Sequence, residues 1–266
     1  MFSFVLSVII LQMMSDSVES FYGQNTKAPH LLKRKILFGI KKGFGGSTER
    51  KDKKANENSS GYNDELDFST VRSSTNIKDY CINFNMNYPG LRKIYNDPLI
   101  FEIDNFFDPN ICDDYIARAQ SKGLQISSQT FSPLTTAKRT STTWYLPYKN
   151  VPEFLYKAEM LTGYPINHYE EPQIVRYEMG QQFSWHYDSL PKSLIRESGQ
   201  RVATLLVYLN TVTGSGATAF KDLKIKVAPK KGSALLFFPC FADGTPDERT
   251  MHAGQIAFDT KWIAQM

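Results

Sequence analysis

The chain has 266 residues, of which 41% are hydrophobic and 13% aromatic, and it can therefore bury one substantial core. Its three cysteines exclude a disulfide framework and show no zinc-site spacing, although Cys81 and Cys112 can pair in an oxidising compartment. The formal net charge is +4, but residues 27–54 alone carry +8, which leaves −4 for the other residues and argues against a nucleic-acid-binding module.

The N-terminal part of the chain differs in composition from the rest. Residues 1–14 are apolar and uncharged, too short a run for a comfortable membrane span, and predict a signal peptide or short signal anchor over 1–20. A buried N-terminal strand is the alternative. Residues 21–95 are basic and polar, which is typical of a largely disordered leader or linker, and Asn58-Ser59-Ser60 is a glycosylation sequon if it enters a secretory lumen.

This leader also bears on location. The apolar start predicts the endoplasmic reticulum and secretory pathway, with membrane contact only through an N-terminal anchor. Phe21 and the basic, acid-poor stretch after it also resemble the bipartite leaders of some algal plastid proteins, so a plastid is the alternative location.

A compact domain is expected over residues 96–266. A first strand at 98–103 is followed by a helix that begins at Pro109, with Asp108 as its N-cap, and runs to about Lys122. A second helix is predicted at 152–161. The chain then changes to short strands separated by Gly, Pro and Asp, which favours an α+β fold with a jelly roll, or double-stranded β-helix, and supporting N-terminal helices. The expected strands are 173–177, 183–187, 203–208, 224–227, 234–237 and a last one near 261.

His186-Tyr187-Asp188 is the most informative motif, because the chain has only four histidines. Residues i and i+2 of an extended strand project from one face, so His186 and Asp188 can present an imidazole and a carboxylate to one ion. With His252 as third ligand, this is the two-histidine, one-carboxylate set of non-haem Fe(II) oxygenases. Alone, such a motif is commonly a solvated surface feature, and its surroundings therefore matter.

Five blocks of the sequence follow one another in order, Gln173–Gly180, His186–Asp188, Arg201–Asn210, Lys230–Phe238 and Met251–Gly254. Together they resemble the prolyl 4-hydroxylase family of Fe(II)- and 2-oxoglutarate-dependent dioxygenases. The resemblance spans about 97–266, is densest over a metal-binding core at 173–266, and is carried by five blocks in order. It implies Fe(II), 2-oxoglutarate and L-ascorbate as cofactors, O2 as co-substrate, and hydroxylation of peptidyl proline to 4-hydroxyproline in a proline-rich or collagen-like protein.

The resemblance also implies roles for further residues. Lys261, nine residues after His252, corresponds to the cation that anchors the distal carboxylate of 2-oxoglutarate, and Tyr177, Thr204 and Tyr208 fall where relatives line the co-substrate site. On the substrate side, Arg139 and Trp144 lie in and beside an Arg-Thr-Ser segment like that of prolyl hydroxylases, and Arg201 matches a peptide-contacting arginine. Phe183, close to His186, is expected to form an aromatic wall for a polyproline II ligand, although packing would also explain it.

The chain departs from the family in three places. Gly214–Lys221 is an altered form of a Gly-Gly-x-Thr segment, and Gln255-Ile256 replaces a Cys-Pro pair. The sequence stops at Met266, where relatives continue into a closing strand, so either the product is truncated or the fold finishes early. A weakened last strand would loosen Lys261 and reduce activity without removing the iron ligands. Two other functions stay open: the same chemistry on a free amino acid or other small substrate, and a catalytically silent jelly-roll binding module. The oligomeric state is not predicted.

Overall fold

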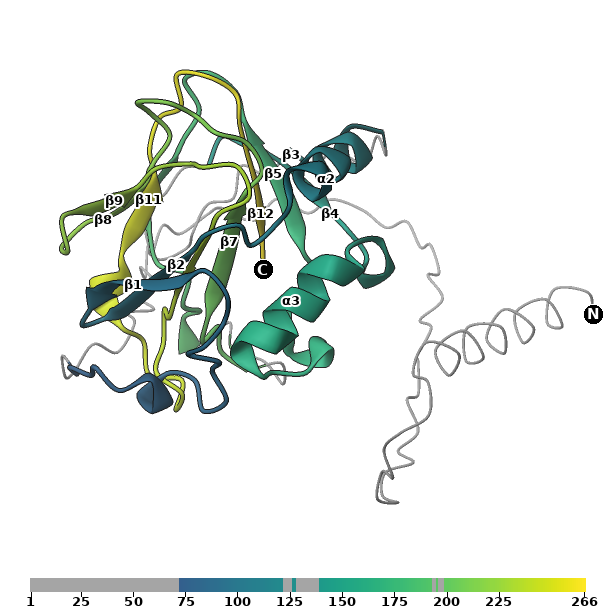
Figure 1. Ribbon diagram of the computed structural model, residues 1–266. Helices are drawn as coiled ribbons and strands as arrows, with labels where there is room; N and C mark the ends of the chain where they lie inside the picture. Colours follow the sequence, from purple (N-terminus) through teal and green to yellow (C-terminus); the bar gives the residue numbers. More distant parts are fainter. Residues whose placement is uncertain (1–71, 122–125, 128–138, 193–194, 196–198) are drawn as a thin grey trace, which may run out of the picture. The chain divides into compact units, whose positions relative to one another are not determined.

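The computed structural model describes residues 72–121, 126–127, 139–192, 195 and 199–266. The predicted signal segment at 1–20 and most of the leader lie outside these residues. The described part of the chain contains no helix long and apolar enough to cross a membrane. Its strands form two antiparallel sheets, and two α-helices accompany the larger one (Figure 1).

The larger sheet has eight strands in the order β1-β2-β10-β7-β12-β5-β4-β3. Its central strands are nearly continuous apolar runs because both faces of the sheet are covered. The strand bounds are β1 Leu91–Asn96, β2 Leu99–Ile103, β3 Ile126–Ser127, β4 Thr142–Tyr145, β5 Gln173–Tyr177, β7 Thr204–Tyr208, β10 Ala234–Phe237 and β12 Lys261–Gln265.

The outer face of this sheet carries the two predicted helices, α2 (Pro109–Ser121) and α3 (Pro152–Thr162). Alternate strand residues such as Leu205, Val207 and Trp262 share one apolar cluster with the buried side chains of both helices. Because side chains alternate along a strand, the residues between them face the opposite way. Short 3-10 turns complete this side at Ile77–Asp79 (η1), Tyr148–Asn150 (η2) and Ile166–His168 (η3).

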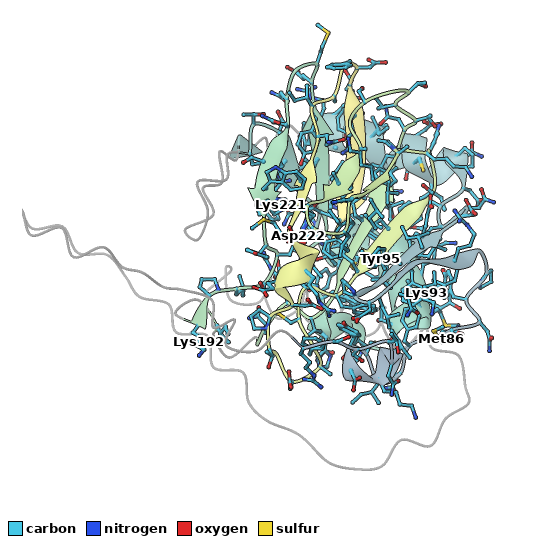
Figure 2. The ribbon with its side chains drawn as sticks, turned by 90° about the vertical axis from the view of Figure 1, so that its left-hand side faces the viewer. Met86, Lys93, Tyr95, Lys192, Lys221 and Asp222 are labelled. Atoms are coloured by element: carbon cyan, nitrogen blue, oxygen red, sulfur yellow. The ribbon has the colours of Figure 1, made fainter. Side chains whose placement is uncertain are left out.

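The inner face packs against a four-stranded sheet of order β6-β11-β8-β9, which gives the predicted jelly-roll sandwich. A second apolar cluster fills the space between the sheets and includes Leu206 and Tyr208 of β7. Figure 2 shows the side of the domain that carries Tyr95 of β1 and Lys221 and Asp222 of the β8–β9 turn, and Tyr95 packs on this cluster. The small sheet comprises β6 Phe183–His186, β8 Thr218–Phe220, β9 Ile225–Val227 and β11 His252–Gly254, with 3-10 turn η5 (Glu248–Thr250) before β11.

The compact domain begins earlier than the predicted boundary at residue 96. Strand β1 pairs with β2, and Tyr80 and Phe84 are buried, at 0% and 9% exposure. The Tyr80 ring stacks on Phe241 with the ring centroids 4.9 Å apart. The interpretation of 21–95 as one disordered leader is therefore wrong for residues 72–95, because aromatic packing holds them against the sheet.

The final strand is not loosened. Strand β12 pairs with β5 on one side and β7 on the other, and Lys261, its first residue, is the direct partner of Tyr177. Lys261 and Ile263 are two residues apart and face inward, toward the space between the sheets. Lys261 thus lies in a strand that is paired on both sides.

Candidate active site

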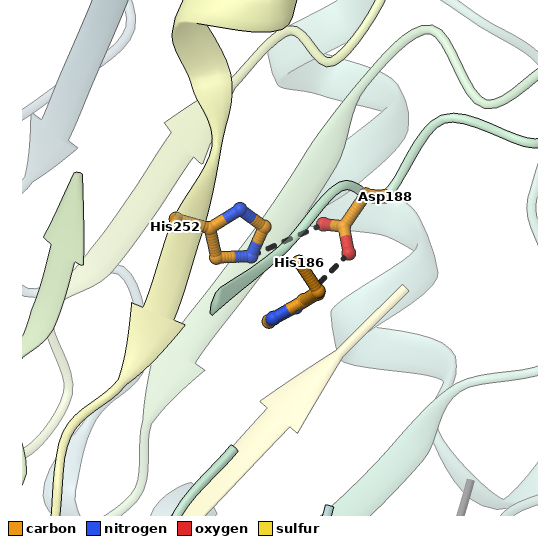
Figure 3. Close-up of side chains that lie close together, drawn as sticks. All are labelled: His186, Asp188 and His252. Atoms are coloured by element: carbon orange, nitrogen blue, oxygen red, sulfur yellow. Dashed lines mark ion pairs between the residues drawn. The ribbon is translucent and has the colours of Figure 1, made fainter. Parts of the chain in front are cut away.

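Two histidines and one aspartate meet where β6 and β11 lie side by side. His186 ends β6, His252 begins β11, and the two are direct partners in the antiparallel register. The carboxylate oxygens of Asp188 lie 3.5 Å from His186 Nε2 and 3.6 Å from His252 Nε2 (Figure 3). All candidate ligand atoms lie within 4.8 Å of one another. Ligand atoms roughly 2.1 Å from an ion and at right angles are about 3 Å apart, so a small contraction would place one divalent ion among these three.

Backbone carbonyls orient both imidazole rings for ligation. His186 Nδ1 lies 2.8 Å from the carbonyl oxygen of Ser184, and His252 Nδ1 lies 3.0 Å from that of Thr250. Each carbonyl accepts a hydrogen bond from an Nδ1–H group, and this tautomer leaves the Nε2 lone pair free for a metal. Both rings therefore present Nε2 toward Asp188.

The electrostatics of the trio also suit a cation. Burial is the main cause that lowers the pKa of His252 to about 4, with the neighbouring His186 ring acting in the same direction, so the His252 ring is neutral at neutral pH. Burial alone would raise the pKa of Asp188, but the two imidazoles and a hydrogen bond from Thr204 outweigh it and hold that pKa below its usual range. Two neutral imidazoles and one carboxylate are the donor set that Fe(II) takes in non-haem oxygenases.

Thr204 lies beside this carboxylate. Its Oγ1 donates a hydrogen bond of 2.7 Å to Asp188 Oδ2 from the first position of β7. The structure thus shows Thr204 orienting a candidate metal ligand, and its place beside the co-substrate stays a prediction.

We expect Thr204→Val to weaken metal binding by about 10- to 100-fold, because partners that orient a ligand contribute affinity on this scale. Thr204→Ser keeps the hydroxyl and should stay within a few-fold of the unaltered protein. Titration with Fe(II) under anaerobic conditions measures both variants. Equal affinities of the valine and serine variants would contradict this role for the hydroxyl.

Lys261 forms a second polar centre between the sheets. Its side chain is 2% exposed, and its ammonium lies 5.2 Å from the Tyr177 ring centroid and 5.8 Å from that of Tyr208. Within the described residues, its one hydrogen bond goes to the carbonyl oxygen of Gly216, at 2.7 Å. Burial lowers the pKa of Lys261 to about 8. A buried ammonium with two N–H groups to spare and no carboxylate partner fits an anionic ligand.

The absence of a side chain at Gly254 leaves space for a methyl group beside Lys261. Gly254 lies two residues after His252 on β11, and a Cβ added there would sit 3.9 Å from Lys261 Nζ and 3.7 Å from Phe183 Cβ. A side chain at this position would thus enter the space between the ligand strand and the lysine. Thr218, which sequence reasoning missed, accepts a 2.8 Å hydrogen bond from the Tyr208 hydroxyl. Thr218 lies within Gly214–Lys221, the segment that departs from the Gly-Gly-x-Thr pattern of the family. This departure was the sequence signal that could have identified Thr218.

Two predicted substrate residues lie near the metal ligands. The Phe183 ring stacks on the His186 ring, with centroids 3.5 Å apart and an interplanar angle of 16°. Arg201 forms an ion pair with Glu170, with Nε–Oε1 at 2.5 Å, and its Nη1 is 3.5 Å from the backbone oxygen of Asp188. Arg201 is thus next to the candidate metal centre, although its charge is already paired.

Trp144 lies elsewhere. It is 3% exposed and belongs to the apolar cluster beneath the helices, where its ring stacks on Trp262 with centroids 5.4 Å apart. Its partner across β4 and β5 is Ile174, which faces the same way. Trp144 therefore packs on the face of the sheet opposite the metal ligands, and its predicted contact with substrate is wrong.

Comparisons with known proteins agree with this geometry. The family model of the 2OG-Fe(II) oxygenase superfamily matches residues 172–266. Prolyl 4-hydroxylase 2 of Arabidopsis thaliana is 29% identical over 212 residues, which cover 67% of this chain and 71% of that protein. Human prolyl 4-hydroxylase subunit alpha-1 is 33% identical over 129 residues, which cover 46% of this chain but 24% of the subunit.

A solved structure extends the likeness to three dimensions. The viral collagen prolyl hydroxylase of Paramecium Bursaria Chlorella virus-1, in its complex with 2-oxoglutarate, superimposes with a TM-score of 0.50 and 28% sequence identity. The match covers 62% of this chain and 93% of the viral protein. The trio of His186, Asp188 and His252 fits Fe(II), and the buried cation fits a dicarboxylic 2-oxo acid. Residues 172–266 belong to the 2OG-Fe(II) oxygenase superfamily, the chain is similar to prolyl 4-hydroxylases, and it is an oxidoreductase that uses Fe(II) and 2-oxoglutarate.

Proposed function

We propose that this protein hydroxylates peptidyl proline to 4-hydroxyproline in a proline-rich or collagen-like protein. The observation that carries the proposal is the convergence of His186, Asp188 and His252 within 4.8 Å. The relatives, which are prolyl hydroxylases from a plant, an animal and a virus, support proline as the target. Two alternative functions are the same chemistry on a free amino acid or other small substrate, and binding by a jelly-roll module without catalysis.

Each residue of the site has a distinct task in this proposal. His186, Asp188 and His252 would hold the ferrous ion, which when bound supplies the dioxygen chemistry that couples oxidation of 2-oxoglutarate to hydroxylation. Lys261 would bind the distal carboxylate, since a charge-assisted contact in a buried site is strong and selects a dicarboxylate. The apolar cluster between the sheets excludes water from both groups. L-ascorbate is proposed as an additional cofactor.

A coupled assay tests the proposal. The full chain is incubated with Fe(II), ascorbate, 2-oxoglutarate and a proline-rich peptide, and both succinate and peptide hydroxylation are measured, the latter by mass spectrometry. Hydroxylated proline in the peptide is the expected result. Hydroxylation of free proline alone would favour the small-substrate alternative, and no oxidation of 2-oxoglutarate with any substrate would favour the binding module.

The pH dependence of co-substrate use follows from Lys261. Its pKa of about 8 means that the ammonium is charged at pH 7 and loses its proton as the pH rises through 8. We therefore expect kcat/KM for 2-oxoglutarate to fall above about pH 8, approaching tenfold per unit, because this parameter reports the free enzyme. Initial rates from pH 6.5 to 9.5 measure it. Lys261→Arg stays protonated over this range, and the same alkaline limb in that variant would refute the assignment.

The size of the residue at position 254 should control co-substrate binding. Gly254→Ala places a Cβ at ordinary contact distances and is expected to change KM for 2-oxoglutarate only a few-fold. Gly254→Val extends further toward Lys261 and should raise that KM by about tenfold or more, because the carbon chain of 2-oxoglutarate needs this space. Calorimetric titration with 2-oxoglutarate separates the variants, and an anaerobic Fe(II) titration serves as control for the neighbouring ligand His252.

We also propose that the protein enters the endoplasmic reticulum and secretory pathway. The apolar residues 1–14 and the sequon at Asn58 support this location. A fluorescent protein fused after residues 1–60 should appear in the endoplasmic reticulum. Plastid fluorescence would support the alternative bipartite leader instead.

A further inference from the structure

Arg139 is a buried cation that forms no ion pair with a carboxylate of the described residues. It is 6% exposed in the fold. Its Nε donates to Ser141 Oγ at 2.8 Å and its Nη1 to Gln173 Oε1 at 3.4 Å, and both acceptors are neutral. Its Nη2 is buried and has no hydrogen-bond partner. The preceding residues 122–138 contain no Asp or Glu that would neutralise it.

Other partly buried arginines of the described chain are paired differently. Arg176 contacts Glu178 at 3.0 Å, and Arg249 contacts both Asp97 and Asp247. A guanidinium taken out of water is costly unless a carboxylate or several good acceptors replace the lost hydration. The guanidinium of Arg139 therefore lacks a negatively charged acceptor among the described residues, and its Nη2 group has no acceptor at all.

The position of Arg139 ties it to the metal ligands. It forms an isolated antiparallel bridge with Phe183, at the outer edge of β6. Its guanidinium carbon lies 5.5 Å from the Phe183 ring centroid, and that centroid lies 3.5 Å from the His186 ring centroid. The guanidinium carbon is thus no more than 9.0 Å from the His186 ring centroid. Gln182 beside it is exposed and Phe183 is partly exposed, so Arg139 lies one layer below the surface.

We propose that Arg139 binds a carboxylate of the substrate, so that the enzyme selects a prolyl substrate that carries a negative charge close to the target ring. This inference rests on the proposed prolyl hydroxylation. The planar guanidinium offers N–H groups in the geometry that a carboxylate accepts, and Nη2 is already free to donate. The carboxylate can belong to a Glu or Asp side chain of a peptide or to the α-carboxyl group of a free amino acid.

Matched pairs of ligands distinguish these sources. One arm uses peptides with a single central proline and one Glu at each of three positions on either side, each beside its Gln counterpart. The other arm uses L-proline beside L-prolinamide. Binding is measured by calorimetry on the full chain loaded with Mn(II) and 2-oxoglutarate, and turnover is measured separately with Fe(II). The variants are Arg139→Gln and, as a matched loss of one positive charge, Arg92→Gln on β1 at the opposite edge of the large sheet.

The expected result is a preference of about tenfold for the acid over the amide in at least one pair, absent in Arg139→Gln and retained in Arg92→Gln. Melting curves of the variants check that each is folded, and Arg139→Lys, which keeps the charge, should keep part of the preference. Equal binding of acid and amide in every pair, no binding of any ligand, or a preference that survives in Arg139→Gln would overturn the inference. Selective binding of the acids without hydroxylation would support carboxylate binding by Arg139 and would refute the proposed prolyl hydroxylation.

Discussion

His252→Ala is expected to lower kcat/KM for 2-oxoglutarate turnover by at least about a thousandfold, a loss of roughly 4 kcal/mol in transition-state stabilisation. The reason is geometric, because His252 supplies one of three candidate ligand atoms that lie within 4.8 Å of one another. With Asp188 and His186 alone, an ion would keep two protein ligands and bind more weakly. Succinate release measures turnover, and an anaerobic Fe(II) titration measures the accompanying loss of affinity.

His168→Ala is the matched control for this substitution. His168 is an exposed residue of η3, where its ring lies 6.0 Å from that of Tyr164. Its replacement removes the same chemical group from a position outside the site, and turnover should stay within a few-fold. Substantial turnover in His252→Ala, or an equal loss in His168→Ala, would show that the metal lies elsewhere.

Lys261→Met is expected to raise KM for 2-oxoglutarate by about a hundredfold, which corresponds to about 3 kcal/mol of binding free energy. Methionine is unbranched and apolar, so it preserves the packing of the buried stem beside Tyr177 and Tyr208 while removing the charge. The unaltered protein should bind 2-oxoglutarate far more tightly than 2-oxopentanoate, which lacks the distal carboxylate. In Lys261→Met the two ligands should bind alike, and calorimetry measures all four combinations.

Urea unfolding of Lys261→Met distinguishes a loss of 2-oxoglutarate binding from misfolding of the variant. Burial disfavours the charged form of Lys261, as its lowered pKa of about 8 indicates, so the charge costs the ligand-free fold free energy at pH 7. Lys261→Met is therefore expected to unfold in urea at the same or a higher midpoint than the unaltered protein. A variant that remains folded and still prefers 2-oxoglutarate would exclude Lys261 as the anchor.

The central strands and the metal trio were predictable because local patterns encode them. Alternation along 204–208 and 261–265 determines which side chains face inward, and Lys261 shares a face with Ile263 for this reason. The trio was identifiable because histidine is scarce in this chain and the His-x-Asp spacing is short. These signals depend on a few neighbouring residues and not on the order of strands in the sheet.

The errors arose where the answer depends on distant parts of the chain. Thr204 faces inward as expected, but its hydrogen bond to Asp188 depends on the packing of β7 against the loop after β6, which local sequence does not show. Trp144 faces outward because of its register with β5, which the motif around it does not reveal. Strand β11 has three residues, His252–Gly254, too few to show a period, and residues 72–95 are held by scattered aromatics in a polar segment.

The position of β12 in the middle of the large sheet affects how the protein is made. Strands β7 and β5 lie on either side of it, so until β12 docks, the two halves of that sheet are joined by no backbone hydrogen bonds between these strands. The strand that is translated last among those described is thus the one that closes the molecule. A ribosome-bound chain stopped before Lys261 would expose two unpaired strand edges, and such edges favour chaperone binding and self-association.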